Sequence, residues 1–218
     1  MRRFNVVAAT AALALCTLAS PSIGAPQSFT IDPVHSQVGF TVRHFFSRVP
    51  GRFRDFSGNI LLDEKNLPGS SVEATIKVAS IFTDNERRDG HLRSQDFFWA
   101  DSFPTMTFKS TSVTPGPNGR FNIAGNLTMR GVTKPVVLDA GFLGAGDVGV
   151  GGQSMGYRAS FEASTTVNRK DYGIVWNKVL DQGGTMLGDD VTISIAVEAV
   201  RSEPEKVAAP GAGKGEKK

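Results

Sequence analysis

The stretch Val72-Glu73-Ala74-Thr75-Ile76-Lys77-Val78 decides the fold class, because apolar side chains occupy every second position and polar ones the positions between. Successive side chains of a β-strand point to opposite faces, so this pattern predicts a strand with one apolar face. Clusters of glycine and proline separate further stretches of this kind and predict turns. The alternation recurs at residues 38–42, 121–129, 136–142, 157–163 and 191–197. The chain is therefore predicted to be all-β, with about eight antiparallel strands.

Two departures from this alternation add detail. The phase slips by one residue between Phe53 and Phe56, which predicts a bulge or a sharp bend. Thr83-Asp84-Asn85-Glu86 has the pattern of a capping box with its threonine as the cap, and it predicts one short helix that runs to about Ser94. Short helical turns are expected at residues 44–49 and 168–173.

The N-terminal residues predict export. Arg2 and Arg3 precede an apolar run over residues 6–18, which is too short to cross a bilayer comfortably and is followed by small residues. This is the pattern of a secretory signal peptide, and we expect cleavage after Gly24, so that residues 1–24 are removed. The alternative is a short membrane anchor.

Composition argues against several function classes. The only cysteine, Cys16, lies within the predicted signal peptide, so we expect no disulfide, thiolate catalysis or cysteine-bound metal in the mature chain. The formal net charge of +3 includes two arginines of the signal peptide and a basic C-terminal tail. Charges on the body between them nearly balance, which argues against a nucleic-acid-binding stripe. Residues 202–218, rich in Ala, Gly and Lys, are predicted to be disordered.

Two stretches match enzyme motifs but lack the required context. Gly152-Gln153-Ser154-Met155-Gly156 has the form of a nucleophile elbow, yet it lies in a predicted hairpin and every histidine precedes it. Residues 144–149 have the form of a dinucleotide fingerprint, yet a strand follows instead of a helix. The histidines, His35, His44 and His91, lack the helical spacing of a metal site. We therefore expect no catalytic residue, no metal and no cofactor.

Polar residues gather in three short stretches. Arg88, Asp89 and His91 fall at the end of the predicted helix, and two roles are open for them. They either clamp the adjoining loop, which is the simpler role, or line the mouth of a pocket and meet a polar head group. Residues 169–172 form a second cluster, for which a solvated turn is the plain interpretation. Residues 32–36 predict a turn that Asp32 caps and His35 joins by a hydrogen bond.

Phenylalanine dominates the aromatic residues. Fourteen of the 15 phenylalanines follow the predicted signal peptide, against two tyrosines and two tryptophans. Phenylalanine supplies apolar bulk without needing a hydrogen-bond partner. An eight-stranded barrel is just wide enough either to be filled by side chains or to hold an oily ligand, and composition leaves both outcomes open. If the lumen is open, the inward side chains expected to line it are Val38, Phe40, Ile76, Phe121, Phe142 and Phe161.

An ordered series of blocks resembles the YceI-like family. It includes Arg88-Asp89-Gly90-His91-Leu92 and Asn168-Arg169-Lys170-Asp171-Tyr172-Gly173. The full series covers residues 29–36, 40–44, 51–53, 56–58, 88–92, 96–98, 103–111, 125–136 and 168–173, so residues 27–201 are expected to form one domain. The resemblance implies an extended eight-stranded antiparallel β-barrel, lipocalin-like in shape. It also implies that the lumen binds a long isoprenoid or other amphiphilic lipid, in a periplasmic or secreted protein with no known reaction.

We therefore expect a periplasmic carrier or sequestering protein for a polyisoprenoid or similar lipid, without nucleic-acid partner or stable membrane insertion. The chain could form a homodimer. Two alternatives come from other classes: a hydrolase acting on a lipid or amide, and a stress-related structural module with a filled core. The hydrolase would need an acid, base or nucleophile that converges on a pocket, whereas the filled core would have no cavity.

Overall fold

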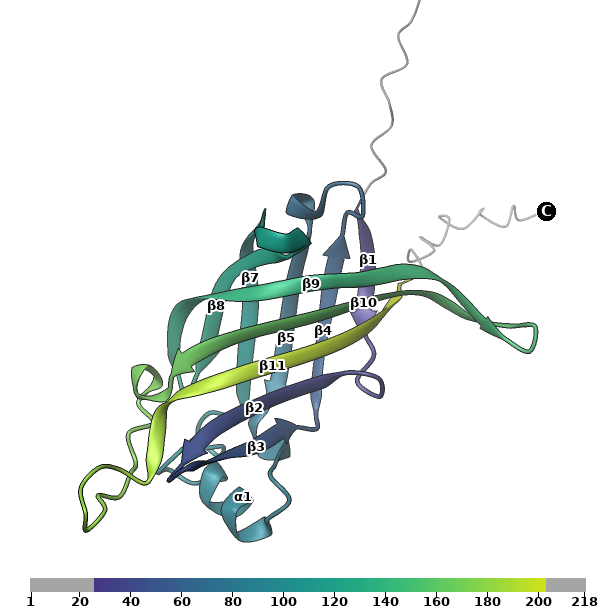
Figure 1. Cartoon of the computed structure of the whole chain (residues 1–218). Coiled ribbons are helices and arrows are strands. Elements are labelled where there is room, and N and C mark those ends of the chain that lie inside the picture. The colour runs from purple at the N-terminus through teal and green to yellow at the C-terminus, as the bar shows by residue number, and fades with distance from the viewer. Residues whose placement is uncertain (1–25, 203–218) are drawn as a thin grey trace, which may run out of the picture.

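A computed structural model describes residues 26–202 of the chain. The described part consists mainly of β-strands, with one α-helix. The predicted signal peptide and, apart from Ser202, the predicted tail lie outside the described residues. Figure 1 shows long, tilted strands that wrap around a common axis. The strands are β1 (Gln27–Ile31), β2 (Gln37–His44), β3 (Ser47–Phe53), β4 (Phe56–Leu62), β5 (Ser71–Lys77), β6 (Ile81–Phe82), β7 (Thr105–Pro115), β8 (Phe121–Met129), β9 (Val132–Val150), β10 (Gln153–Asn168) and β11 (Leu187–Arg201). The helices are α1 (Glu86–Arg93) and the 3-10 turns η1 (Leu67–Gly69), η2 (Val78–Ser80), η3 (Pro117–Gly119) and η4 (Arg169–Tyr172).

The sheet closes on itself through β11. The order β1-β4-β5-β7-β8-β9-β10-β11 is completed by the pairing of β1 with β11, so eight antiparallel strands form a ring. One edge of β11 pairs with β10, and the other edge is shared: β2 pairs with residues 187–196 and β1 with residues 199–201. From β2, the sheet continues through β3 to β6. The predicted antiparallel barrel is confirmed.

Three of the long strands are broken into two segments each. Along the chain, β1 is followed by β2, β3 by β4, and β5 by β6. One segment of each stays in the ring, where the pairings are β1–β4 and β4–β5. The other segments pair outside the ring as β2–β3 and β3–β6. The predicted irregularity between Phe53 and Phe56 is the break between β3 and β4. Both phenylalanines are buried on either side of it. The break thus restores the inward phase that the alternation loses there.

Two local expectations need correction. Helix α1 is capped by Asn85, whose side chain accepts a hydrogen bond of 2.9 Å from the backbone N–H of Arg88. The predicted cap, Thr83, is instead bonded through its hydroxyl to Asp89 and Arg88. Residues 44–49 form the tight turn and strand ends of a hairpin, because β2 and β3 stay paired up to His44 and Ser47. Residues 168–173 do contain a helical turn, η4.

Burial is greatest where the ring closes. Phe29 of β1 and Ala199 of β11 are fully buried, and Ala159 of β10, the partner of Ala199 in the sheet, is nearly so. Next to this closure, β9 and β10 leave the ring together. β8 pairs with β9 only up to Ala140, and β11 pairs with β10 only from Arg158, so the intervening residues project as a two-stranded hairpin (Figure 1).

Gly125 of β8 makes room for an aromatic ring on the inner face of the barrel. A β-carbon at this position would lie 2.4 Å from Cζ of Phe108 and 2.7 Å from the backbone oxygen of Lys109. Real carbon atoms do not approach so closely, and the backbone oxygen cannot move without disturbing the sheet. The missing side chain at this inward position is therefore a packing requirement of the neighbouring strand β7.

We expect Gly125→Ala to lower the free energy of unfolding by about 1–3 kcal/mol, since the added methyl overpacks the β7–β8 pair. Gly146→Ala is the matched control in the same sheet, because a β-carbon there meets no atom within 4 Å. The control should be neutral or slightly stabilising. Urea unfolding of both variants measures the difference, and equal midpoints would contradict this account of Gly125.

Candidate functional site

An elongated cavity of about 970 Å³ runs inside the barrel. Its lining extends from Asn85, beside α1, to Ser71, at the far end of β5. Most of the lining side chains are aliphatic or aromatic, as the inward positions of the alternating strands require. This volume lies near the upper end of the roughly 300–1,000 Å³ typical of small-molecule pockets. The lumen is therefore open and not filled by side chains.

All six side chains predicted to face an open lumen line this cavity: Val38, Phe40, Ile76, Phe121, Phe142 and Phe161. Aromatic rings pack against each other along the wall instead of meeting across the lumen. The rings of Phe142 and Phe161, on neighbouring strands, are 5.3 Å apart, and those of Phe40 and Phe53 are 5.8 Å apart. This tilted packing along the wall leaves the axis of the barrel free.

Most charged groups of the lining lie at the end of the cavity next to α1, whereas Glu162, which is paired with Arg120, lies in the wall away from α1. Arg87 and Arg88 of α1, together with His44 at the end of β2, contribute to the wall next to α1. Arg87 and Arg88 are exposed, so the cavity reaches the protein surface beside α1. We call this opening the α1 mouth. The distribution is suited to an amphiphile whose polar group lies at the α1 mouth and whose chain extends into the barrel.

Arg88 and Asp89 both hold Thr83, which precedes α1. The buried Asp89 carboxylate accepts a hydrogen bond of 2.9 Å from the Thr83 backbone N–H and a second one from its hydroxyl. Arg88 donates from Nε to the same hydroxyl at 2.7 Å and from Nη2 to the Thr83 carbonyl. These contacts form a clamp on the start of the helix. Arg88 also lines the cavity, whereas Asp89 does not.

His91 ties α1 to the loops around it. Its Nε2 lies 2.8 Å from a carboxylate oxygen of Asp96, and its ring meets the rings of Phe97 and Trp176 edge-on, with centroids 4.9 Å apart in each case. Phe97 and Trp176 line the cavity with His91. The three residues of the predicted polar cluster thus lie together, and each has a partner that fixes a loop.

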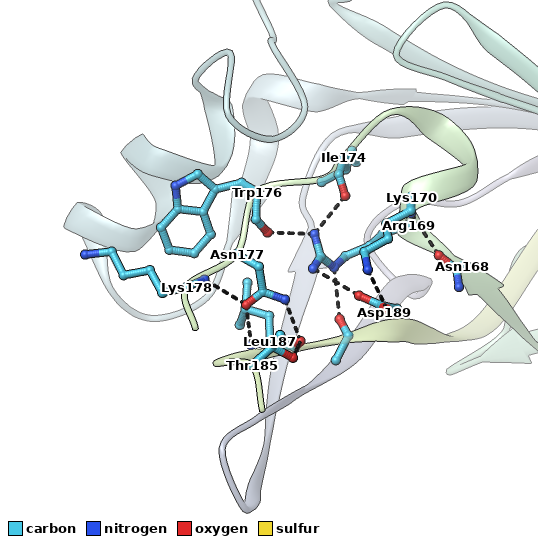
Figure 2. Close-up of polar contacts among 11 residues, drawn as sticks. Asn168, Arg169, Lys170, Ile174, Trp176, Asn177, Lys178, Thr185, Leu187 and Asp189 are labelled. Atoms are coloured by element: carbon cyan, nitrogen blue, oxygen red, sulfur yellow. Dashed lines mark hydrogen bonds and ion pairs between the residues drawn. The ribbon is translucent and has the colours of Figure 1, made fainter. Parts of the chain in front are cut away.

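Arg169 is buried and donates hydrogen bonds to several backbone carbonyls, a role that the sequence does not indicate (Figure 2). It was expected in a solvated turn, but only 4 % of its surface is exposed. Its Nη1 donates to the carbonyls of Ile174 and Trp176 at 2.7 and 2.8 Å, and its Nε donates to the carbonyl of Gly188 at 2.9 Å. Nη2 lies 3.3 Å from a carboxylate oxygen of Asp189. Burial lowers the pKa of Arg169, and the nearby Asp189 opposes this shift.

The network around Arg169 shapes the segment between η4 and β11. Asn177 continues it: its side-chain oxygen accepts from the Leu187 N–H at 3.0 Å, and its amide nitrogen donates to the Leu187 carbonyl at 2.9 Å (Figure 2). Since Trp176 and Leu187 both line the cavity, the network positions one side of the α1 mouth. The polar sequence of residues 169–172 gave no indication of this burial.

Arg130 links two loops at the same end of the barrel. It occupies the β8–β9 turn with a φ of 50°. Its Nη1 donates to the Gly173 carbonyl at 2.6 Å, and its Nη2 donates to the Gln95 carbonyl at 2.9 Å. The guanidinium thus joins the loop after η4 to the loop after α1. Three arginines donate hydrogen bonds to backbone carbonyls around the α1 mouth: Arg88, Arg130 and Arg169.

A separate ion cluster lies outside the cavity, at the break between β1 and β2. Asp32 caps the turn and lies 2.8 Å from Nδ1 of His35, as the sequence predicts. Arg158 donates to Asp32 at 3.1 Å and also to Glu198. The ligand atoms of Asp32, His35 and Glu198 lie within 4.8 Å of one another, a spacing compatible with a metal ion. The guanidinium of Arg158 already supplies positive charge to both carboxylates.

Nothing in the histidine contacts favours hydrolytic chemistry. Within residues 26–202, the side-chain hydrogen bonds of histidine go to Asp32 and Asp96, both carboxylates. A hydrolase of the serine type needs its histidine bonded to a nucleophile. Ser154 of the elbow-like motif lies at the start of β10 in the projecting hairpin, where its hydroxyl accepts a hydrogen bond of 3.2 Å from the Gly156 N–H.

The sequence matches the model of the YceI-like domain over residues 29–199, most of the chain. The chain belongs to the YceI-like family. A UPF0312 protein of Azotobacter vinelandii is 39% identical over 196 residues, which cover 87% of this chain and 97% of the relative. The family assignment predicted from the ordered sequence blocks is thus confirmed.

Two solved structures share the fold of this YceI-like protein. BcnA of Burkholderia cenocepacia superposes with a TM-score of 0.68 at 21% sequence identity, over 78% of this chain and 99% of BcnA. A polyisoprenoid-binding domain from Saccharophagus degradans superposes with a TM-score of 0.58 at 14% identity, over 81% of this chain and 99% of that domain. Within residues 26–202, no helix has the length and apolar character needed to cross a bilayer.

We expect Arg169→Met to lower the free energy of unfolding by about 3–5 kcal/mol, because it leaves buried carbonyls and Asp189 without their donor. Lys170→Met is the control, since Lys170 is half-exposed and its ion pair with Asp189 is on the surface. The control should cost about 1 kcal/mol or less. Chemical denaturation of both variants checks this, and a mild effect of Arg169→Met would show that the network is dispensable.

The contacts of Asp32 predict a pH dependence. The hydrogen bond from His35, together with that from Arg158, lowers the pKa of Asp32 to about 2 in the folded protein. A carboxyl with a lowered folded-state pKa stabilises the fold above its unfolded pKa of about 3.9, and that contribution is lost as the pH falls toward 2. Asp32→Asn should therefore be less stable than the wild type at pH 7, and the difference should vanish near pH 2. Thermal melts across this range measure it; a constant gap would contradict the assignment.

Proposed function

We propose that this YceI-like protein binds a polyisoprenoid or similar long amphiphilic lipid in the barrel lumen, and carries or sequesters it in the periplasm. The observation that carries the proposal is the open apolar cavity, about 970 Å³ in volume, with most of its charged groups at one end. The structural neighbour described as a polyisoprenoid-binding domain supports the same ligand class. The signal-peptide pattern of residues 1–24 supports export.

The physical basis of binding is burial of the chain. Each methylene that leaves water for the lumen contributes about 0.8 kcal/mol, so a long chain is held without any specific polar contact. Such a site selects for length and apolar character. The polar end of the lipid then lies at the α1 mouth, where Arg87 and Arg88 provide donors. The family and the fold neighbours point to a binding protein, and the contacts in the cavity give no support to the hydrolase alternative.

Mass spectrometry of an organic extract tests the proposal most directly. Protein purified from its native host should release one unaltered long-chain lipid in near-stoichiometric amount. An extract without lipid would remove the support for carriage, and a cleaved product would favour the hydrolase.

A blocked lumen provides the matched test in vitro. Ala163 of β10 lines the cavity, and Ala196 of β11 is exposed on the outer face. Ala163→Phe should weaken binding of a long polyisoprenoid roughly tenfold or more, because the ring displaces several methylenes from the lumen. A shorter chain should be affected less, and Ala196→Phe should bind as the wild type does. Titration with fluorescent polyprenols of two lengths measures these effects; equal affinities for both variants would refute binding in the lumen.

A further inference from the structure

The β2–β3 hairpin ends in a turn with an unfavourable backbone conformation and an exposed aromatic side chain. His44 pairs with Ser47, so Phe45 and Phe46 form a two-residue turn. Phe45 has a φ of 50°, in the left-handed region, where glycine is favoured at the first position of such a turn. The side chain of Phe46 is fully exposed to solvent. A strained backbone that presents an aromatic ring to water indicates that the turn serves a function.

The segment before β11 adds apolar side chains next to this turn. The Phe45 N–H donates to the Met186 carbonyl at 2.9 Å, which joins the turn to that segment. Val175 and Val179 lie in the same segment, and 65% and 81% of their surfaces are exposed. Figure 1 shows the β2–β3 turn, this segment and α1 at one end of the barrel, whereas the β9–β10 hairpin projects at the other.

Basic side chains surround the exposed apolar residues. Arg43 and Arg48 are cross-strand partners in the β2–β3 hairpin, an unfavourable arrangement for two like charges. Lys178 lies beside Val179, and Arg87 lies at the α1 mouth. In the part of the chain that the structure describes, Arg48, Lys178 and Arg87 take part in no ion pair. Their charges are therefore free for an external partner.

Exposed apolar side chains with basic neighbours match the interface of an anionic bilayer, where rings enter the acyl boundary and cations meet lipid phosphates. Three exposed acids, Asp84, Glu86 and Asp181, lie on the same loops and helix, so apolar insertion must supply much of the binding. A protein partner would explain the apolar residues alone. The unpaired cations around them favour lipid phosphates.

We propose that this end of the barrel docks on an anionic lipid bilayer. The docking surface consists of Phe45, Phe46, Val175, Val179, Arg48, Lys178 and Arg87. Because Arg87 also lines the cavity, docking would bring the α1 mouth against the membrane. Contact is peripheral, through side chains of a turn and a loop. The proposal concerns the surface only, so it does not depend on which molecule occupies the lumen.

Vesicle cosedimentation tests the docking surface. The purified protein should bind vesicles rich in phosphatidylglycerol and bind phosphatidylcholine vesicles much more weakly. Phe46→Ser should weaken binding about tenfold, because it removes an inserted ring, and Arg48→Gln about fivefold, with less sensitivity to salt. Val150→Ser is the control, since Val150 is another exposed apolar residue, at 68%, on the β9–β10 hairpin. It should leave vesicle binding unchanged.

A second variant keeps the test independent of folding effects. Phe46→Trp should show blue-shifted emission and quenching by brominated lipid when phosphatidylglycerol vesicles are added, and Val150→Trp should show neither. Failure of the wild type to bind either vesicle would overturn the proposal and leave the surface to a protein partner. Weaker binding by Val150→Ser than by Phe46→Ser would overturn it in favour of the β9–β10 hairpin. Lipid extraction from the same preparations reports on the lumen separately.

Discussion

The shared edge of β11 is the constraint on which the rest of the molecule depends. β1 and β2 pair with different parts of that edge. At one end of the barrel β1 closes the ring, and at the other end the sheet continues outside the ring through β2. The strands that follow must break at matching levels, as β3 and β4 do at residues 54–55. α1 follows β6 and precedes β7 along the chain, and the cavity reaches the surface beside this helix.

Backbone carbonyls bound by arginine take the place of regular sheet at this end. Arg88, Arg130 and Arg169 donate to carbonyls of the segments around the α1 mouth. Irregular segments leave backbone acceptors unpaired, and a guanidinium can satisfy several at once through its fixed fork of donors. The mouth is therefore held by directional contacts, whereas the wall of the lumen depends on apolar packing. A lipid-binding protein would use both properties, because the fixed opening positions the polar end of the lipid and the apolar lumen accepts its chain without specific contacts.

The sequence predicts those features that follow from local periodicity. The alternation around Ile76 and Ile193 identifies strands and their inner faces, and the phase slip between Phe53 and Phe56 marks a real break. Local pattern does not predict burial of a polar side chain, which is why the sequence favours a solvated turn where Arg169 is in fact buried. Nor does it decide between two adjacent caps: Asn85 replaces Thr83 because Asp89, a residue of the helix itself, binds the threonine hydroxyl. Whether fourteen phenylalanines fill a lumen or line it depends on how the rings pack between strands.

Closure through β11 also sets the order in which the chain can fold. The hydroxyls of Thr30 and Ser202 lie 3.0 Å apart at the seam, although 172 residues separate them. The other ring partners are near neighbours in sequence, so hairpins such as β9–β10 can form early, while the seam must wait for the end of synthesis. Before the seam forms, any sheet built from the earlier strands has two unpaired edges and an uncovered apolar face, which invites association with other chains. A chaperone that protects this protein would need to hold that open sheet.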